Sequence, residues 1–278
     1  RACSWGTTRY VPESALAEAR ENDDLGGSFL GFHPPGWFSR IVPLPGCALA
    51  SAAMNQVIVA VQAMGLGPAW DTRTHTGTWR HLVLRDAGTP DDPAVLVTLV
   101  TSSAATEEEV RAVADTIAAL DGVRSVLWVV TDRLSEVAVG ELRAVLHGEP
   151  WMDVTLGRAE LRLPHDAFFQ VNTAGAHVLV DTIEEALFPD GPVDPAAAGT
   201  LLDLYCGVGA IGLALAHRFA EVVGVEVHDG AIASATDNAA RSGVAGRWLA
   251  GPVEDVLPGL DTPRPRRVVV DPPRVGLH

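Results

Sequence analysis

The stretch LLDLYCGVGAIGLALA, residues 201–216, decides the fold of this chain. It opens on an apolar run that ends at Tyr205, which is typical of a buried parallel strand. Gly207, Gly209 and Gly212 follow in the spacing G-x-G-x-x-G, and an apolar run of helical length comes after them. Glycines at this spacing allow a tight turn and let a ligand approach the backbone closely. A strand, a glycine turn and a helix in this order predict a nucleotide site, because the helix N-terminus presents unpaired N–H groups.

The glycine spacing alone does not identify the nucleotide. Glu226 ends the next predicted strand, where an acid would hold a ribose in a dinucleotide-binding protein. Asp203 lies inside the first strand and would repel a diphosphate, whereas S-adenosylmethionine has no phosphate and carries an ammonium and a sulfonium group. Asp271 opens the turn Asp-Pro-Pro-Arg after a third strand, at the strand end where ligands bind in open α/β sheets. These acids favour S-adenosylmethionine over NAD.

Strands and helices alternate through the second half of the chain. Together with the glycine stretch, this alternation predicts a doubly wound α/β domain, a Rossmann-like methyltransferase domain, over residues 161–278. Residues 1–160 are predicted to form an α+β domain that ends in a hairpin turned at Gly157. The strands expected in the second domain are 201–205, 222–226, 246–249 and 267–270. Those expected in the first are 4–11, 28–33, 38–44, 78–84, 94–101 and 123–131, with helices at 51–64 and 104–120.

Composition is that of a soluble globular protein, with 47% hydrophobic and 20% charged residues among 278. No apolar run is long enough for a transmembrane helix, so we expect no membrane association. The net charge is −15 and all 20 basic residues are Arg, an acid excess that is unusual for a partner of nucleic acid. Four arginines crowd the C-terminal strand and its turn, where they form either a solvated face or an RNA-facing patch: Arg264, Arg266, Arg267 and Arg274.

Three cysteines, Cys3, Cys47 and Cys206, lie far apart without a C-x-x-C pair. This argues against a disulfide framework and against a self-contained zinc or iron–sulfur site, and it suits a reducing compartment.

The segment AFFQVN, residues 167–172, precedes a predicted helix and has two interpretations. The aromatic side chains could stack on a base while Gln170 hydrogen-bonds a base edge. Alternatively, Phe168 and Phe169 belong to the core and Asn172 caps the helix. The residues alone favour the second interpretation.

Taken together, these motifs resemble the RNA (uracil-5-)-methyltransferases, which make 5-methyluridine in tRNA and ribosomal RNA. The matches run nearly end to end, and the front part is most similar to the plant and cyanobacterial branch. The matching segments are AFFQVN at 167–172, LLDLYCGVGAIGL at 201–213, VVGVEV at 222–227, VVVDPPRVGL at 268–277 and, more weakly, 31–49 and 75–85.

The resemblance implies roles for individual residues. Gln170, Tyr205, Glu226 and Asp271 would contact S-adenosylmethionine, beside the loop glycines Gly207 and Gly209. The substrate uracil, flipped out of its stack, would face Gln170, Phe169, Asp271 and Arg274. Ala210 and Pro252 depart from the family pattern at positions where some members carry a polar contact to the cofactor.

The family's chemistry starts when a Cys thiolate attacks C6 of uracil, and a carboxylate base later removes the C5 proton. In the family, both groups follow the DPPR-x-G motif, so we expect them after His278. The chain would then be a fragment that lacks both ends, is inactive alone, and leaves strand 267–270 with an exposed, aggregation-prone edge. Cys206 is expected to be a packing residue. Cys47 matches a possible iron–sulfur ligand in the family, although a plain buried thiol is the preferred interpretation.

Three other functions compete with this one. They are a nucleic-acid methyltransferase acting on an adenine amino group, an NAD(P)-dependent oxidoreductase, and an RNA-binding module without activity. Arg274 follows the two prolines where the adenine enzymes normally have an aromatic residue, which disfavours the first. We expect a monomer that acts on rRNA or tRNA, in the cytoplasm or in an organelle such as the chloroplast.

Overall fold

The computed structural model describes residues 2–6, 28–32, 42–43, 46–71, 74–89, 91–134, 137–170, 172–261 and 267–272. The chain divides into two compact units, Arg1–Pro150 and Trp151–His278. The prediction from sequence places this boundary ten residues later, after residue 160. The difference is one hairpin, which packs against helices of the second unit and so belongs to it. Among the described residues, no helix has the length and apolar character that crossing a membrane would require.

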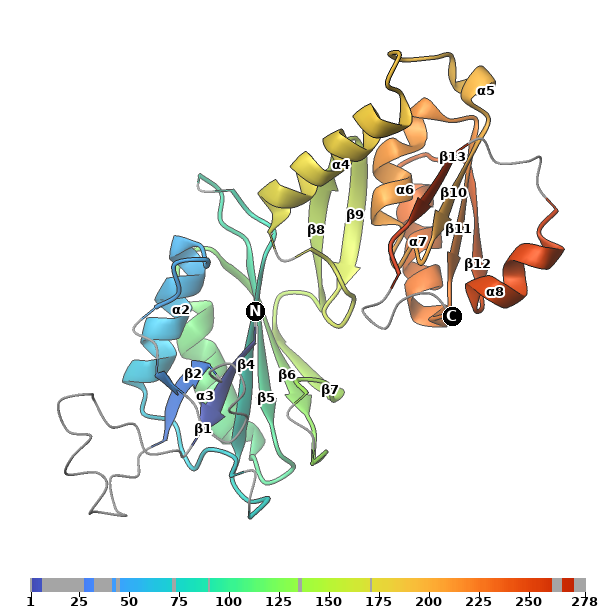
Figure 1. Ribbon diagram of the computed structural model, residues 1–278. Helices are drawn as coiled ribbons and strands as arrows, with labels where there is room; N and C mark the ends of the chain where they lie inside the picture. The colour runs from blue at the N-terminus through green and yellow to red at the C-terminus, as the bar shows by residue number, and fades with distance from the viewer. Residues whose placement is uncertain are drawn as a thin grey trace, which may run out of the picture. The chain divides into compact units, whose positions relative to one another are not determined.

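The first unit is built on a seven-stranded sheet in the order β3-β2-β1-β4-β5-β6-β7 (Figure 1). Neighbouring strands are antiparallel except β5 and β6, which are parallel and joined by helix α3. The elements are β1 (Ala2–Gly6), β2 (Phe29–Phe32), β3 (Val42–Pro43), α2 (Ala52–Ala63), β4 (Trp79–Asp86), β5 (Val95–Thr101), α3 (Glu107–Ala118), β6 (Val123–Val130) and β7 (Glu141–His147). The predicted α+β pattern is thus found, with β7 as a strand that the sequence did not predict.

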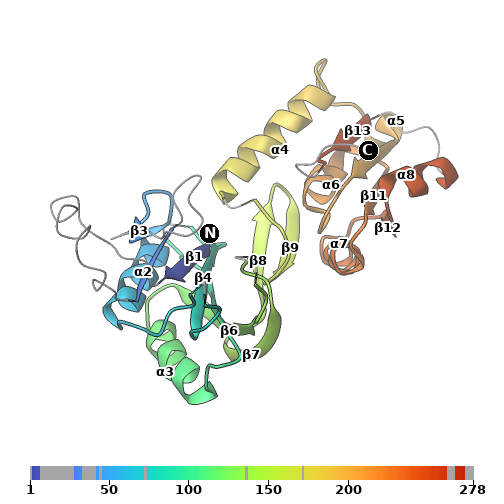
Figure 2. The same cartoon turned by 60° about the horizontal axis from the view of Figure 1, so that its bottom comes forward.

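The two helices of this unit begin where side chains can satisfy their first N–H groups. Ser51 caps α2, and Thr106 with Glu109 forms a capping box at α3. Both helices lie on the same side of the sheet (Figures 1 and 2). There the apolar side of each helix packs on alternate residues of β4, β5 and β6. These helix and strand side chains together form one buried core.

The second unit contains a four-stranded sheet in the order β12-β11-β10-β13, in which every pair is parallel. Its elements are β8 (Trp151–Leu156), β9 (Ala159–Pro164), α4 (Thr173–Leu187), α5 (Pro195–Ala198), β10 (Thr200–Leu204), α6 (Ala210–Leu215), the 3₁₀ turn η2 (Ala216–Arg218), β11 (Glu221–Glu226), α7 (Asp229–Arg241), β12 (Gly246–Ala250), α8 (Val253–Val256), the 3₁₀ turn η3 (Leu257–Gly259) and β13 (Arg267–Val270). All four predicted strands are present, and the doubly wound α/β prediction is confirmed.

Helices cover this sheet on both faces, with α6 and α7 on one side and α8 on the other (Figure 1). The strand order reverses between β10 and β13, because the chain first moves outward to β12 and then returns past β10. In open α/β sheets, ligands bind at the carboxyl ends of the strands at such a reversal.

Strand β13 pairs only with β10 within the described part of the chain, and Val268 and Val270 are exposed on it.

Candidate functional site

A pocket lies at the point where the strand order reverses. It is formed by the loop after β10, the residue after β13, the segment before α4, one face of α4, and the tip of the β8–β9 hairpin. The residues that line it are Leu156, Phe168, Phe169, Gln170, Ala176, Leu179, Val180, Asp203, Tyr205, Cys206, Gly207, Val208, Ala210, Ile211 and Asp271. Four predicted site residues are therefore gathered around one pocket together with the loop: Phe169, Gln170, Tyr205 and Asp271.

The loop after β10 contains three residues with positive φ angles. Gly207 and Gly209 have φ angles of 53° and 80°, and Tyr205 also has a positive φ of 62°. A side chain at Gly209 would meet the Trp248 ring at 3.0 Å, so close packing as well as backbone conformation requires glycine there. The Gly209 N–H donates to the Cys206 carbonyl at 2.9 Å and closes the turn.

Side chains from three other elements hold this loop in place. Glu226, at the end of β11, accepts the Gly207 N–H at 3.2 Å. Asp203 in β10 accepts the Gly212 N–H at 2.9 Å, and Asn238 in α7 donates to the Val208 carbonyl at 3.2 Å. Contacts within the chain thus fix both the loop and the first turn of α6.

Asp203 is the buried acid of the pocket, with 1% of its surface exposed. Burial raises its pKa from the ordinary 3.8 to about 7, the Gly212 N–H opposes that rise, and the negative charge of Asp271 adds to it. Two carboxyl groups therefore share the wall of one pocket, where a bound cation would relieve their repulsion.

Burial, helped by the charges of Asp203 and Glu226, also raises the pKa of the Cys206 thiol. A protonated, buried thiol is a poor nucleophile. The geometry therefore fits the packing role expected for Cys206.

Each of the two interpretations of the AFFQVN segment holds for some of its residues. Asn172 is the N-cap of α4 and accepts the Gly175 N–H at 2.9 Å. Phe168, however, is 75% exposed, so the core interpretation is wrong for that ring. Phe169 is half-buried and Gln170 is exposed, and all three line the pocket. Of the two rings, the family resemblance assigned only Phe169 to the site, so Phe168 was not among the predicted site residues.

Other predicted residues lie elsewhere. Glu226 stands behind the loop, where its carboxylate accepts N–H groups from Gly207 and His228. Arg267 is used internally: its Nε donates to the Leu187 carbonyl at 2.7 Å. The Arg267 side chain is therefore half-buried and makes a structural contact, so it does not form part of an open basic patch. Arg264, Arg266 and Arg274 lie outside the described residues.

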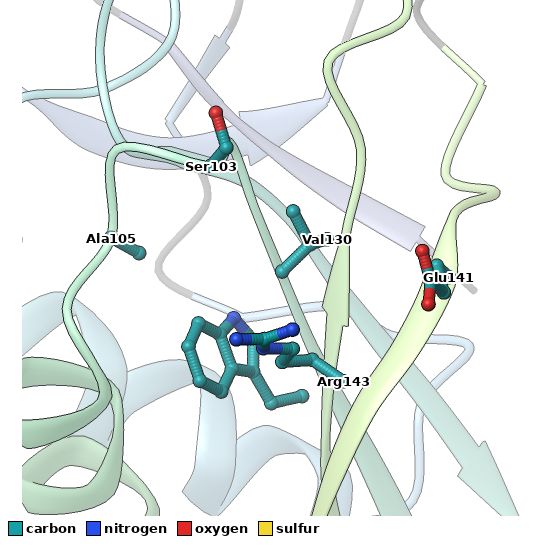
Figure 3. Close-up of a pocket in the computed structure, with 6 residues that line it drawn as sticks. Ser103, Ala105, Val130, Glu141 and Arg143 are labelled. Carbon is teal, nitrogen blue, oxygen red and sulfur yellow. The ribbon is translucent and has the colours of Figure 1, made fainter.

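Cys47 belongs to the first unit, half-buried against its core, and its N–H donates to Asn55 Oδ1 at 2.7 Å. Across the described ranges, no three His, Cys, Asp or Glu side chains group as a metal site would require. A second pocket also lies in this unit, at the ends of β5, β6 and β7 (Figure 3). It is lined by Ser103, Ala105, Trp128, Val130, Glu141 and Arg143, none of which was predicted to act.

Several known proteins are similar to this chain. Residues 171–275 match the family model described as "Methyltransferase small domain". The chain is 32% identical over 264 residues to an uncharacterized RNA methyltransferase of Chlorobaculum tepidum, covering 90% of this chain and 52% of that protein. It is 30% identical to one of Thermosynechococcus vestitus, covering 90% and 54%. The chain thus spans about half the length of the curated relatives it matches.

Among solved structures, the chain is similar to the Pyrococcus abyssi tRNA (uracil-54, C5)-methyltransferase in complex with S-adenosyl-L-homocysteine. The TM-score is 0.72 at 24% identity, over 90% of this chain and 58% of that one. The chain is therefore related to proteins named as RNA methyltransferases. Its second unit has the Rossmann-like fold of S-adenosylmethionine-dependent methyltransferases, as predicted.

Proposed function

We propose that the pocket binds S-adenosylmethionine and that the protein in which this chain occurs methylates C5 of a uridine in RNA. The observation that carries the first part is the buried Asp203 carboxyl beside Asp271 at the glycine loop. A dinucleotide would bring a diphosphate to these acids, whereas S-adenosylmethionine brings an ammonium and a sulfonium. The residues present therefore fit a cationic ligand.

Residues that line the pocket, and Glu226 behind the loop, have proposed roles in holding that ligand. The Asp203 and Asp271 carboxylates would balance its positive charge, and Glu226 would accept hydrogen bonds from its ribose hydroxyls with the lone pairs that Gly207 and His228 leave free. Tyr205 and the loop backbone would contact its apolar surface. When bound, it supplies an electrophilic methyl group.

The RNA part of the proposal is supported by the relatives' names and by the exposed aromatic segment. Phe168, Phe169 and Gln170 stand at the pocket, where an aromatic ring can stack on a flipped base and an amide can bond its edge. The specificity for C5 of uracil rests on the likeness to the tRNA (uracil-54, C5)-methyltransferase and on the FFQ-x-N and DPPR-x-G motifs.

The proposed reaction needs a nucleophile and a base besides the methyl donor. A Cys thiolate adds to C6 of uracil, C5 takes the methyl group, and the base removes the C5 proton as the thiolate leaves. Cys206 is buried and its thiol pKa is raised, so we propose that it is not the nucleophile; the family resemblance implies that the nucleophile and the base follow the DPPR-x-G motif.

Nucleoside analysis tests the RNA part. RNA incubated with S-adenosylmethionine and the protein in which this chain occurs should gain 5-methyluridine, and RNA labelled with tritium at uridine C5 should lose one tritium for each methyl group gained. Methylated adenosine, or methyl transfer without tritium release, would contradict the assignment of uridine C5.

A further inference from the structure

Asn238 is an uncharged polar side chain buried completely inside the second unit, with 0% of its surface exposed. It lies on α7, and its side-chain amide makes two hydrogen bonds, each to a different segment of the chain. Its Oδ1 accepts the backbone N–H of Arg162 in β9 at 2.7 Å, and its Nδ2 donates to the Val208 carbonyl at 3.2 Å. A single amide therefore connects the β8–β9 hairpin with the glycine loop.

Both of the segments that Asn238 joins are walls of the same pocket. Val208 lines it from the loop, and Leu156, at the end of the hairpin's first strand, lines it from the other side. The distance between these walls depends on what fixes the hairpin relative to the loop: α7 touches both, and α6, which follows the loop directly, also packs on β9.

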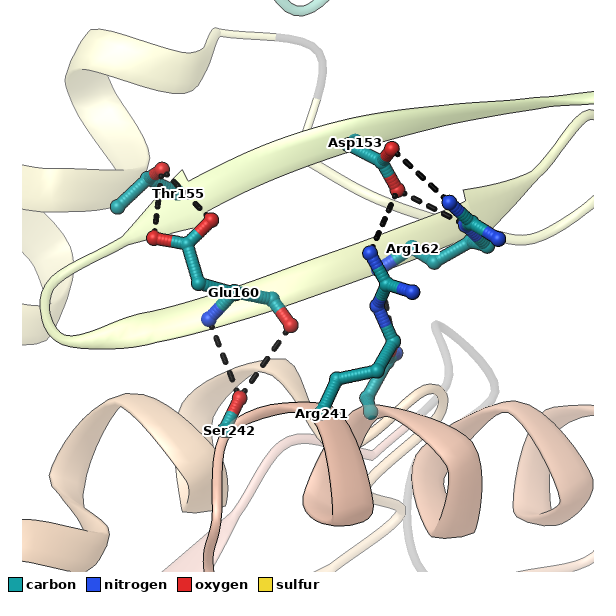
Figure 4. Close-up of polar contacts among 7 residues, drawn as sticks. Asp153, Thr155, Glu160, Arg162, Arg241 and Ser242 are labelled. Carbon is teal, nitrogen blue, oxygen red and sulfur yellow. Dashed lines mark hydrogen bonds and ion pairs between the residues drawn. The ribbon is translucent and has the colours of Figure 1, made fainter.

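Other contacts between α7 and the hairpin are peripheral (Figure 4). The Ser242 hydroxyl accepts the Glu160 N–H at 3.1 Å, and the Arg241 guanidinium lies 3.4 Å from Asp153, which also pairs with Arg162. These groups are exposed or half-exposed, so hydrogen bonds to water can replace the bonds between them at little cost in free energy. Unlike Asn238, neither Ser242 nor Arg241 has a described hydrogen bond or ion pair to the glycine loop.

We propose that Asn238 is a positioning residue, which sets the ligand-ready shape of the glycine loop by tying the Val208 peptide to the hairpin. The identity of the ligand rests on the proposed function, whereas the effect on the loop does not. The Val208 carbonyl bonds to α7, and Val208 also lines the pocket beside the turn that the Gly209 N–H closes.

The substitution Asn238→Asp tests this without changing the size of the side chain. The new carboxylate still accepts the Arg162 N–H, but when ionised it has no hydrogen to offer the Val208 carbonyl. Protonating it restores an O–H donor in the same place. We therefore expect the variant to bind S-adenosylmethionine about tenfold more weakly than the unmodified chain at about pH 8, and this ratio to shrink as the pH falls.

The ratio of the two proteins at each pH is the measured quantity, because the other acids around the loop, Asp203, Asp271 and Glu226, are the same in both. Ser242→Ala is the matched control: it also removes a bond between α7 and the hairpin, and its affinity should stay within about twofold of the unmodified chain. An unchanged affinity in Asn238→Asp, or a loss that low pH does not restore, would overturn the proposal.

Hydrogen exchange of the ligand-free chain separates this inference from the proposed function. In Asn238→Asp at neutral pH, the amides of Gly207 and Gly209 should exchange faster, while that of Arg162 stays protected. Equal protection of the loop amides in both proteins would refute the positioning role. If the unmodified chain binds no S-adenosylmethionine but the loop amides respond as expected, the proposed function fails and the positioning role stands.

Discussion

The Asp203 carboxyl group is buried in the pocket and has a raised pKa. Its folded-state pKa is raised to about 7, so the folded protein keeps a proton that the unfolded chain releases at a lower pH. The contribution of Asp203 to the stability of the folded state therefore falls as the pH rises from about 4 to about 7. A ligand that brings a positive charge reverses this penalty, which is the physical reason for expecting a cation in the pocket.

The substitution Asp203→Asn should consequently stabilise the ligand-free protein. The amide oxygen can still accept the Gly212 N–H, but the side chain no longer titrates. Its advantage in free energy of unfolding should grow by at least about 1 kcal/mol between about pH 5.5 and pH 7.5, since one unit of pKa shift corresponds to about 1.4 kcal/mol. Denaturant unfolding at the two pH values measures it. An advantage that does not change with pH would mean that the carboxyl is not titrating in this window.

Cys206 should be inert toward thiol reagents in the folded protein. Burial and two neighbouring acids raise its pKa, so hardly any thiolate exists at about pH 8. After brief alkylation with iodoacetamide, mass spectrometry should find the Cys206 peptide unmodified, and unfolding in denaturant should make it react fully. Rapid alkylation of the native protein would contradict the packing role.

At the scale of the element, helix α6 fits against β10 and β11 only because Gly212 has no side chain. A Cβ there would lie 2.7 Å from Asp203 Oδ2 and 3.0 Å from the Val222 side chain. We expect Gly212→Ala to destabilise the protein by about 1–3 kcal/mol and to weaken cofactor binding, because the helix must move away from the strand.

Gly230→Ala provides the matched control for that substitution. Gly230 lies in α7, and a Cβ added to it would meet nothing within 4 Å, so alanine should be neutral or stabilising by up to about 1 kcal/mol. The midpoint of thermal unfolding should fall in Gly212→Ala and stay the same or rise in Gly230→Ala. Equal losses would show that packing between α6 and the sheet is not the limiting constraint.

The elements also show how far sequence reasoning reaches. The glycine stretch and the four alternating strands are local patterns, so the second unit's fold was predictable. Strand β7 was not, because it is an edge strand in which exposed and half-buried residues alternate and only Leu146 is buried. The β8–β9 hairpin was predicted, but its place in the second unit depends on packing against α7, which no local pattern reveals.

The candidate site shows the same limit. Gln170, Tyr205 and Asp271 were predicted and lie around the pocket. Asn238 was not, because an Asn within a helix looks like a solvated residue until the structure shows two partners far away in sequence. Phe168 was missed because exposure, and not residue type, separates it from Phe169.

At the scale of the whole molecule, the division into two units predicts where a ligand acts. Binding stabilises the part that holds the ligand, by about 2.7 kcal/mol at a hundredfold excess over Kd. Saturation with S-adenosylmethionine should therefore slow hydrogen exchange in β10 and β11 and leave β5 and β6 of the first unit unchanged. Equal slowing in both units would show that the first unit takes part in binding this ligand.

The central claim is that the glycine-loop pocket takes a cationic S-adenosyl ligand and rejects a dinucleotide. Isothermal titration calorimetry of the 278-residue chain with S-adenosylmethionine and with NADH tests it most directly, with Glu226→Ala as a comparison. We predict one S-adenosylmethionine per chain, weaker binding in Glu226→Ala, and no heat from NADH. Binding of NADH without S-adenosylmethionine would contradict the account and show that the acids around the loop do not select the ligand.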